Sequence, residues 1–481
     1  MSSRGGKISL FEGVDRIAVL LYVVLVAIGF VNILSASYND DAEIFSFSQQ
    51  YIKQLMWISV AFSVALIILL LDSRYYHMYA YYAYVFGLLF LAGTLIPGVS
   101  DVVKGAKAWY EFGPIRIQPV EFAKIATALA VARLMSNYTF TIKNFGHLVH
   151  VGLIILLPFI IIIMQNDTGS GVVLSSFILV LYREGLNKWI CIPIIIVAVL
   201  FVCSFLFTPL FLLAMLLLVF TLSDAMMIGR WKMHIVFAAS ICFLALLLNV
   251  LSTLFWDGAL SGYASLVIAT AVGVVVAALY AWKRNITAVF LSLALFVFSA
   301  LFVPTADKIF ESVLKDYQRE RIISFLGITN DPRGIDYNVN QAKIAIGSGG
   351  LVGKGFMEGT QIRYGYVPEK HTDFIFCAVG EEWGFIGTMT VLALLCALIL
   401  RLMRMGERQE EPFSRIYSYC VASILLFHVF VNVGVTVGLF PVMGIPLPFL
   451  SYGGSSLVAF TIMVFIAIRL DSTQQSGITA L

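Results

Sequence analysis

The chain has 481 residues, of which 60% are hydrophobic and 12% are charged. A soluble domain carries about 25% charged residues, so this composition excludes an ordinary soluble protein and indicates a chain that crosses a membrane many times. The net charge of +3, without a tract of Lys and Arg, excludes the usual signature of a nucleic-acid-binding protein. All six cysteines lie in apolar runs, which disfavours disulfides and Cys-ligated zinc.

A helix needs about 20 apolar residues to cross a bilayer. Spans of this kind are expected at 17–37, 54–71, 78–97, 120–136, 148–165, 170–183, 189–206, 209–224, 234–254, 262–282, 286–305, 374–400, 416–437 and 449–468. Only a short break at Pro209 separates two of these spans, so a count of twelve to fourteen stays open. The sequence predicts an all-α polytopic membrane protein with about fourteen transmembrane helices.

Basic residues predict the orientation, because Lys and Arg are retained on the cytoplasmic side of membrane proteins. The basic N-terminus precedes an apolar run of about 20 residues, which is typical of an uncleaved first span. If the N-terminus is cytoplasmic, the inner connections carry Arg74, Arg133, Arg183, Lys283, Arg401, Arg408 and Arg469. This alternation places both termini in the cytoplasm and three larger polar segments outside, at 98–119, 305–373 and 438–449.

The first outer segment contains GAKAWYEFGPIRIQPVEFAK (Gly105–Lys124). Basic residues that are kept on the outer side of the membrane indicate an anionic ligand. We expect Lys107 and Lys124 to meet a phosphate, and Trp109 to pack on a sugar or a lipid. Glu121 and Lys124 are three residues apart on one face of a helix and can pair. An ordinary loop with one ion pair is therefore the alternative interpretation.

The next polar motif is QNDTGSG (Gln165–Gly171), which lies between two apolar segments. An ionisable group at membrane depth usually faces a cavity or a partner, which makes Asp167 a candidate for substrate binding. The alternative is that Asp167 caps the helix that follows.

The large polar segment 305–373 contains IAIGSGGLVGKGF (Ile344–Phe356). This run lacks the spacing of a Walker A loop, but a glycine-rich backbone can bring its N–H groups close to a phosphate. Lys354 within it and Arg321 upstream are candidates to bind the same charge. Further candidates for substrate binding in this segment are Gln341, Glu369, His371 and Thr372.

The segment ends in PEKHTDF, which places Asp373 at the first turn of the next apolar helix. Asp373 is either an N-cap, which the helix dipole favours, or a general base at the membrane surface; the two roles are compatible. Glu381 and Glu382 follow at membrane depth and must be protonated, paired or hydrated.

The last polar motif is VGLFPVMGIPLPFLSYGGSS (Val437–Ser456). Its prolines predict an irregular, re-entrant segment, which is tolerated at membrane depth only where it lines protein or a water-filled cavity. Ser451 and Tyr452 are expected to line that cavity, and Ser451 is a candidate for substrate binding.

In this order, these motifs resemble those of the SEDS family (shape, elongation, division and sporulation), whose members include RodA and FtsW. The resemblance covers the first 185 residues and about 305–470, and the stretch from Gly359 to Phe374 is more similar to RodA than to FtsW. The chain departs from the family pattern at a few positions. Ala108, Val120, Asn166 and Met443 stand where the family usually has a basic residue, Ser, Pro and Thr.

The resemblance implies a peptidoglycan glycosyltransferase that polymerises lipid II, at the outer face of the bacterial cytoplasmic membrane, in cell elongation and shape maintenance. A class B penicillin-binding protein would crosslink the strands. The family's essential acid falls on Asp373, its Trp on Trp109, and its basic residues on Lys107 and Lys124. Asp373 would take a proton from the 4-hydroxyl of the acceptor sugar. The basic residues, with Arg321 and Lys354, would neutralise the departing undecaprenyl pyrophosphate. A divalent cation (Mg²⁺ or Mn²⁺) is compatible with this chemistry but cannot be assigned to residues.

The expected organisation has four parts: a membrane region at 1–185, an insertion at 186–304, a large extracytoplasmic loop at 305–373 and a second membrane region at 374–481. The insertion offers five spans where the family has one. Two other classes of function stay open, namely a flippase for a lipid-linked precursor and a non-catalytic scaffold for a transpeptidase.

Overall fold

The computed structural model describes residues 13–38, 49–103, 106–113, 115–229, 231–255, 259–312, 316–325 and 335–479. The chain divides into two compact units. The first unit comprises Met1–Leu186 and Asn330–Leu481, and the second comprises Asn187–Thr329.

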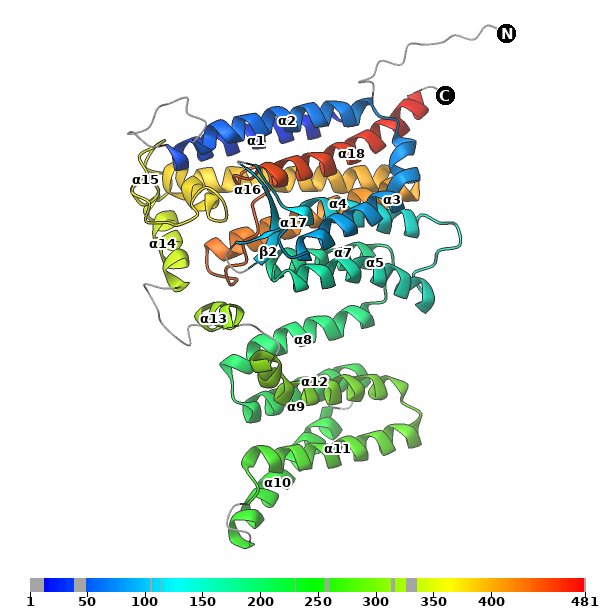
Figure 1. Cartoon of the computed structure of the whole chain (residues 1–481). Helices are drawn as coiled ribbons and strands as arrows, with labels where there is room; N and C mark the ends of the chain where they lie inside the picture. Colours follow the sequence, from blue (N-terminus) through cyan, green and yellow to red (C-terminus); the bar gives the residue numbers. More distant parts are fainter. Residues whose placement is uncertain are drawn as a thin grey trace, which may run out of the picture. The chain divides into compact units, whose positions relative to one another are not determined.

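Most of the first unit is a bundle of long helices that lie side by side (Figure 1). Its helices are α1 (Arg16–Ser37), α2 (Gln50–Leu70), α3 (Ser73–Ala92), α4 (Pro119–Met135), α5 (Phe145–Met164), α6 (Thr168–Val173), α7 (Phe177–Arg183), α14 (Ile335–Ser348), α15 (Thr360–Arg363), α16 (Ile375–Arg408), α17 (Pro412–Thr436) and α18 (Gly454–Thr479). The 3-10 turns η1 (Gly93–Leu95) and η2 (Leu174–Ser176) complete it.

The second unit is also helical. It contains α8 (Lys188–Leu206), α9 (Pro209–Ile228), α10 (Trp231–Phe255), α11 (Gly262–Arg284), α12 (Thr287–Ser312) and α13 (Asp316–Phe325). Pro209 begins α9 behind the N-cap Thr208, so the two spans on either side of this break are separate helices, as predicted.

Ten helices of the described residues are long and apolar enough to cross a membrane. They are α1, α2, α3, α5, α9, α10, α11, α16, α17 and α18. This confirms the prediction of an all-α polytopic membrane protein. Each of the fourteen predicted spans overlaps a helix, but the full count of fourteen stays a prediction.

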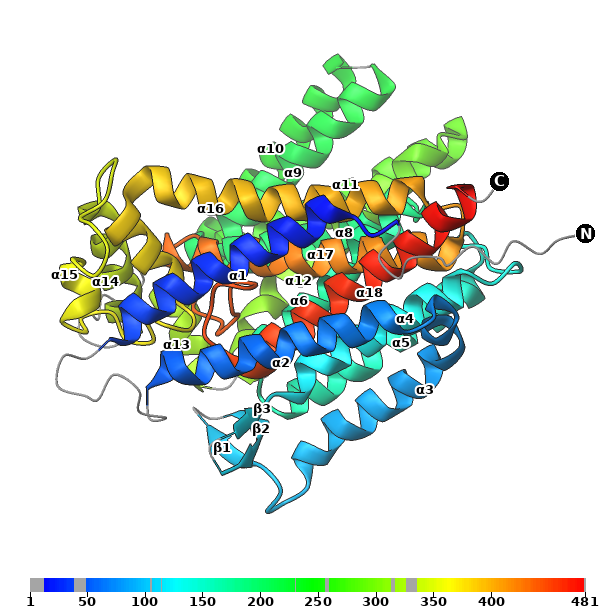
Figure 2. The same ribbon diagram turned by 90° about the horizontal axis from the view of Figure 1, so that it is seen from above.

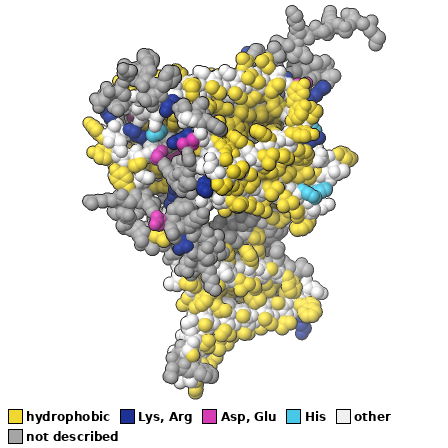
Figure 3. Space-filling view, in the orientation of Figure 1, with side chains coloured by type: hydrophobic (Ala, Val, Ile, Leu, Met, Phe, Trp, Pro, Cys, Tyr) yellow, Lys and Arg dark blue, Asp and Glu magenta, His cyan; other side chains and the backbone are white. Residues whose placement is uncertain are grey.

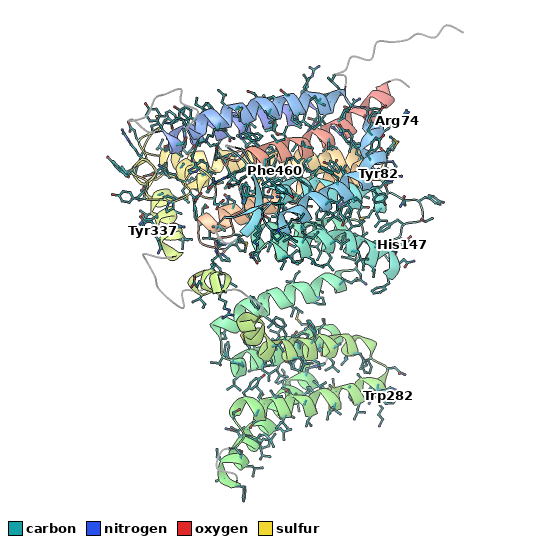
Figure 4. The ribbon with its side chains drawn as sticks, viewed as in Figure 1. Arg74, Tyr82, His147, Trp282, Tyr337 and Phe460 are labelled. Atoms are coloured by element: carbon teal, nitrogen blue, oxygen red, sulfur yellow. The ribbon has the colours of Figure 1, made fainter. Side chains whose placement is uncertain are left out.

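The surface of the first unit also has the pattern of a membrane protein. Hydrophobic side chains cover the middle of the bundle, and charged side chains gather towards its ends (Figure 3). Arg74 and His147 lie at one end, whereas Tyr337 of α14 lies at the opposite end (Figure 4). The two ends are called here the Arg74 end and the α14 end.

The first outer segment forms a small antiparallel sheet that was not predicted. Its strands are β1 (Asp101–Val103), β2 (Ala106–Phe112) and β3 (Ile115–Ile117), and it lies towards the α14 end (Figure 2). The side chains of β2 alternate, as they must in a strand: Ala108 and Tyr110 are buried, whereas Lys107 is exposed. The hydroxyl of Tyr110 donates to the carbonyl of Phe90 at 2.9 Å and fixes the sheet to α3.

At the Arg74 end, an ion-pair cluster joins the ends of three helices. Asp15 caps α1 by accepting from the Ala18 amide at 3.0 Å. Its carboxylate also binds Arg401 at 2.8 Å and Arg408 at 2.9 Å, and Arg408 binds Asp471 of α18 as well. The Asp15 side chain is 1% exposed, so the cluster closes this end of the bundle.

The helix α16 is interrupted at Gly384, whose backbone is not helical (φ 64°, ψ −158°). The loop 349–355 enters this break. The amides of Lys354 and Gly355 donate to the carbonyls of Glu381 and Glu382, each at 3.0 Å. In return, the amides of Phe385 and Ile386 donate to the carbonyls of Gly350 and Leu351 at 2.9 and 3.1 Å. The loop thus binds the two carbonyls and the two amides that would bind each other in an unbroken helix, where Phe385 would donate to Glu381 and Ile386 to Glu382.

The same contact explains why the loop is rich in glycine. A Cβ on Gly353 would lie 2.1 Å from the carbonyl oxygen of Glu382, and its φ of +87° disfavours any other residue. A Cβ on Gly349 would lie 2.0 Å from the carbonyl oxygen of Gly380. Ile344–Ser348 is helical, and the amides of Lys354 and Gly355 donate to α16; that N–H groups of this run approach a phosphate stays a prediction.

Candidate functional site

The turn that carries Asp373 is held by main-chain contacts from both sides. The Tyr452 amide donates to the carbonyl of His371 at 2.8 Å, and the Ser451 hydroxyl donates to the carbonyl of Thr372 at 2.7 Å. The Asn432 amide group donates to the carbonyl of Asp373 at 2.9 Å. Three consecutive carbonyls are therefore occupied, which fixes the backbone under the carboxylate.

The Asp373 side chain is half-buried and lies against Gly444, because a Cβ there would be 3.7 Å from its Oδ2. The helix α16 begins at Ile375 after the N-cap Phe374, so Asp373 is not the N-cap that was one interpretation. The segment between α17 and α18 is irregular, as predicted, but α18 begins only at Gly454 rather than at 449.

The first outer segment and the QNDTG turn meet at the same part of the bundle. Gln118 donates its side-chain amide to Asp167 at 3.1 Å, and the Lys107 amide donates to the Gln165 carbonyl at 2.9 Å. A Cβ on Gly169 would lie 2.0 Å from the carbonyl oxygen of Met443, so this turn packs on the segment that contacts Asp373. The first outer segment, the QNDTG turn and the segment 437–453 are therefore remote in sequence but packed together in the fold.

Asp167 also accepts from the Ser170 amide at 3.2 Å and is the N-cap of α6. The capping alternative is thus confirmed, and the carboxylate additionally holds the first outer segment through Gln118.

A buried trio of side chains lies in the same part of the bundle and comprises Glu121, Lys124 and His428. Lys124 Nζ is 2.8 Å from the carboxylate of Glu121 and 2.8 Å from Nε2 of His428. The other ring nitrogen of His428 is 3.1 Å from the carbonyl of Pro446. An ammonium group only donates, so Nε2 accepts, and Nδ1 carries the proton and donates to Pro446. Lys124 also lies 5.6 Å from the centre of the Phe460 ring, in the middle of the bundle (Figure 4).

The predicted pairing of Glu121 with Lys124 is confirmed, and both side chains are 1% exposed. This environment favours a structural role for Lys124 over direct contact with a phosphate. His428 and Asn432 are four residues apart on α17, so they share a face and join the trio to the Asp373 turn.

Lys354 likewise has a protein partner. Its Nζ lies 2.6 Å from Glu381, whose carboxylate also accepts from the amides of Gln361 and Ile362, each at 2.9 Å. Glu382 accepts from the Ser35 hydroxyl of α1. Glu381 is therefore paired and Glu382 is hydrogen-bonded, in line with the expectation that acids at this depth are protonated, paired or hydrated. That Lys354 binds a pyrophosphate stays a prediction.

The remaining predicted residues lie in different places. Lys107 is exposed and Trp109 is half-buried on β2. Thr372 donates to Glu369 at 2.9 Å, and the ring of His371 lies 5.8 Å from that of Tyr452. Gln341 is half-buried on α14, and Arg321 lies on α13, in the second unit.

Several residues of the site were missed by the sequence interpretation. Arg116 of β3 interacts electrostatically with Tyr452, whose amide holds the Asp373 turn. Its side chain is 61% exposed and pairs with Glu111 at 2.8 Å. Arg116 was available as a basic residue on the expected outer side. Asn432 and His428 are polar residues inside an apolar run, which indicates that they face a partner but does not identify it.

Two groups outside the membrane-spanning helices, Tyr452 and Lys370, have shifted pKa values. Burial raises the pKa of the Tyr452 hydroxyl, and the positive charge of Arg116 opposes this shift. Burial lowers the pKa of Lys370, although Glu382 opposes this, and the Lys370 ammonium donates to the carbonyl of Ile362. Tyr452 therefore stays a neutral donor and acceptor beside Asp373.

Within the residues that the structure describes, no three His, Cys, Asp or Glu side chains are grouped so that they could hold a metal ion. The divalent cation stays a prediction. A Mg²⁺ ion often uses one carboxylate together with substrate phosphates, and Asp373 is a residue of the right type for that donor set.

The fold and the site define a polytopic helical membrane protein with a half-buried carboxylate at a helix mouth, beside an exposed basic strand pair. The model of the cell cycle protein family that includes FtsW, RodA and SpoVE matches residues 15–225 and 207–476. The chain belongs to this family.

Individual relatives agree. The chain is 29% identical to the peptidoglycan glycosyltransferase RodA of Treponema pallidum over 469 residues, 96% of this chain and 98% of that protein. It is 27% identical to the peptidoglycan glycosyltransferase MrdB of Escherichia coli K12 over 409 residues, 84% and 81% of the two chains. A solved chain of a peptidoglycan synthase complex that coordinates polymerization and crosslinking has the same fold, with a TM-score of 0.60 and 23% identity over 96% of this chain and 98% of that chain.

Proposed function

We propose that this protein is a peptidoglycan glycosyltransferase that polymerises lipid II at the outer face of the cytoplasmic membrane, with Asp373 as general base. The observation that carries this function is the half-buried Asp373 carboxylate on a turn whose three carbonyls are fixed by α17 and the segment 437–453. A rigid main chain aims the carboxylate without an entropic cost during the reaction. The relatives named as glycosyltransferases support the reaction class.

In the proposed reaction, a carboxylate oxygen of Asp373 accepts the proton of the acceptor sugar's 4-hydroxyl. The hydroxyl oxygen then bonds to the anomeric carbon of the growing strand, and the bond from that carbon to the pyrophosphate breaks. The electron pair leaves with undecaprenyl pyrophosphate. We assign Lys107 and Arg116 to this anion, because both side chains are exposed, whereas Lys124 is buried with Glu121 and Lys354 is paired with the buried Glu381. Arg116 would exchange its solvent-exposed pair with Glu111 for the anion.

The proposed partner is a class B penicillin-binding protein, which crosslinks the strands that this chain polymerises. The support comes from the family and from the synthase complex whose chain shares this fold. We place both termini in the cytoplasm and the Asp373 turn outside. Arg74, together with Arg183, Arg401, Arg408 and Arg415 of the ion pairs at the same end, supports this orientation.

The test is polymerisation of labelled lipid II by the purified chain with its partner. Asp373→Asn keeps the volume of the side chain but cannot take a proton, so we expect activity to fall by about 10²–10⁴-fold. The matched control is Asp72→Asn, which changes an exposed acid at the start of α3, and we expect it to retain activity. Full polymerisation by Asp373→Asn would refute the catalytic assignment and favour a flippase or a scaffold.

A further inference from the structure

The second unit contains a cavity of about 230 Å³ between α9, α10, α11 and α12. Figure 1 shows these four helices, and all residues that line the cavity belong to them or to the turn before α12. Its walls are mainly apolar, with Leu217, Phe220, Phe237, Ile241, Val274 and Phe296. An apolar cavity of about 150 Å³ stays dry and can bind benzene, so this cavity has room for a larger apolar group rather than for ordered water.

One end of the cavity is polar. Asp224 is hydrogen-bonded to the Ser292 hydroxyl and interacts electrostatically with His234. His234 is 9% exposed, and its Nε2 has no hydrogen-bond partner in the described part of the chain. A buried ring nitrogen without a partner costs about 1–3 kcal/mol, and a carboxylate at membrane depth is costly as well. A ligand whose polar head hydrogen-bonds to His234 and Asp224 would reduce both free-energy costs.

These polar groups come together because of where they lie along the helices. Asp224 is near the end of α9 and Tyr280 is near the end of α11, whereas His234 and Ser292 are near the starts of α10 and α12. The exposed residues Lys232, Lys283 and Arg284 lie at this same end of the unit, as does Trp282 (Figure 4). The cavity is therefore polar near one end of the helices and apolar further along them.

We propose that this cavity binds a small amphiphile whose apolar part fills the space between α9, α10, α11 and α12. Its head is an uncharged or cationic hydrogen-bond donor, an alcohol or an amine, that lies between Asp224 and His234. The Asp224 carboxylate repels anionic heads, which excludes carboxylates and phosphates. The proposal uses only the second unit and does not depend on the glycosyltransferase activity.

The test is photolabelling of the full-length chain in lipid nanodiscs with three probes. Each probe carries the same eight-carbon chain with a diazirine, and the heads are an amine, an alcohol and a carboxylate. We expect the amine and alcohol probes to label peptides of α9–α12 about tenfold more than the carboxylate probe, since a hydrogen bond to a charged group contributes about 1.5–3 kcal/mol. Excess octylamine or octanol should compete with this labelling.

Two variants locate the binding. Ala277→Phe places a ring into the cavity and should abolish the labelling, whereas Leu279→Phe, 58% exposed on the other face of α11, should not change it. Asp224→Asn should reduce the labelling by the amine probe to the level of the carboxylate probe. Size-exclusion profiles verify that each variant is folded. Equal labelling by all three heads, or undiminished labelling of a folded Ala277→Phe chain, would overturn the proposal.

Discussion

Individual residues of this protein act through partners that are remote in sequence. Asn432 binds the carbonyl of Asp373, and His428, one turn earlier on α17, binds Lys124. These contacts hold the Asp373 turn and the buried Lys124 ammonium group in fixed positions. Each contact predicts a specific cost when one partner is removed.

The buried pair of Glu121 and Lys124 gives the first such prediction. Lys124→Met leaves Glu121 buried without its partner, so we expect a loss of about 3–5 kcal/mol in the free energy of unfolding. The double variant Glu121→Gln, Lys124→Met should lose much less, because no buried charge remains. Chemical denaturation in detergent measures both. If the two variants were equally destabilised, the pair would not be the source of the effect.

Asp15 gives a prediction about pH. Burial opposes its ionisation, but Arg401, Arg408 and the Ala18 amide hold its pKa below the usual 3.8. The folded state therefore favours the carboxylate more than the unfolded state does. This contribution is fully present above pH 3.8 and is lost as pH falls through the lower folded pKa. Asp15→Asn should flatten the fall in melting temperature as the pH is lowered below 3.8. An equal slope for this variant and the unaltered chain would contradict the prediction.

At the scale of elements, the break in α16 is the feature that shapes the site. The helix segment that follows Asp373 ends where the loop 349–355 enters, and Lys354 neutralises Glu381 at the same place. The loop 349–355 is thus built into the helix that follows the Asp373 turn, and it is not a separate cover.

Glycine variants test this arrangement. Gly353→Ala forces a Cβ into the carbonyl of Glu382 at a positive φ, so we expect a loss of at least about 1–3 kcal/mol in unfolding free energy and reduced polymerisation. Gly347→Ala, in α14, meets no atom within 4 Å and should be neutral or stabilising by about 0.5–1 kcal/mol. If Gly353→Ala and Gly347→Ala changed the unfolding free energy equally, loop 349–355 would not be what stabilises the break in α16.

Some of these elements could be predicted from sequence and others could not. Runs of apolar residues predict the long helices, because burial of the backbone in lipid leaves no other structure for them. The motif at Asp373 predicts the acid at a helix mouth. The strands β1 and β3 are three residues each, too short for a pattern to emerge. The second partner of Lys124, His428, lies 304 residues away, and Glu381 lies 27 residues from Lys354. Such contacts depend on tertiary packing, for which one sequence carries no local signal.

At the scale of the whole molecule, the two ends of the first unit differ in character. Ion pairs dominate the Arg74 end, where Arg183 binds Glu407 and Arg415 binds Glu184. The α14 end carries the irregular and glycine-rich segments. The proposed orientation, with the Arg74 end in the cytoplasm and the Asp373 turn outside, is open to a direct test.

Cysteine accessibility tests the orientation. Tyr366→Cys, half-exposed in the turn after α15, should react with a membrane-impermeant maleimide in intact spheroplasts. Glu410→Cys, exposed between α16 and α17, should react only after lysis. The unaltered chain serves as the control for its native cysteines. The reverse pattern would place the Asp373 turn inside.

The insertion of loop 349–355 into α16 also limits how this protein can change in evolution. Two pairs of hydrogen bonds join residues 350–355 to residues 381–386 in a fixed order. Adding or deleting one residue within that loop would leave the amides opposite the wrong carbonyls. The length of this loop is therefore constrained by a helix that begins only at Ile375, later in the chain.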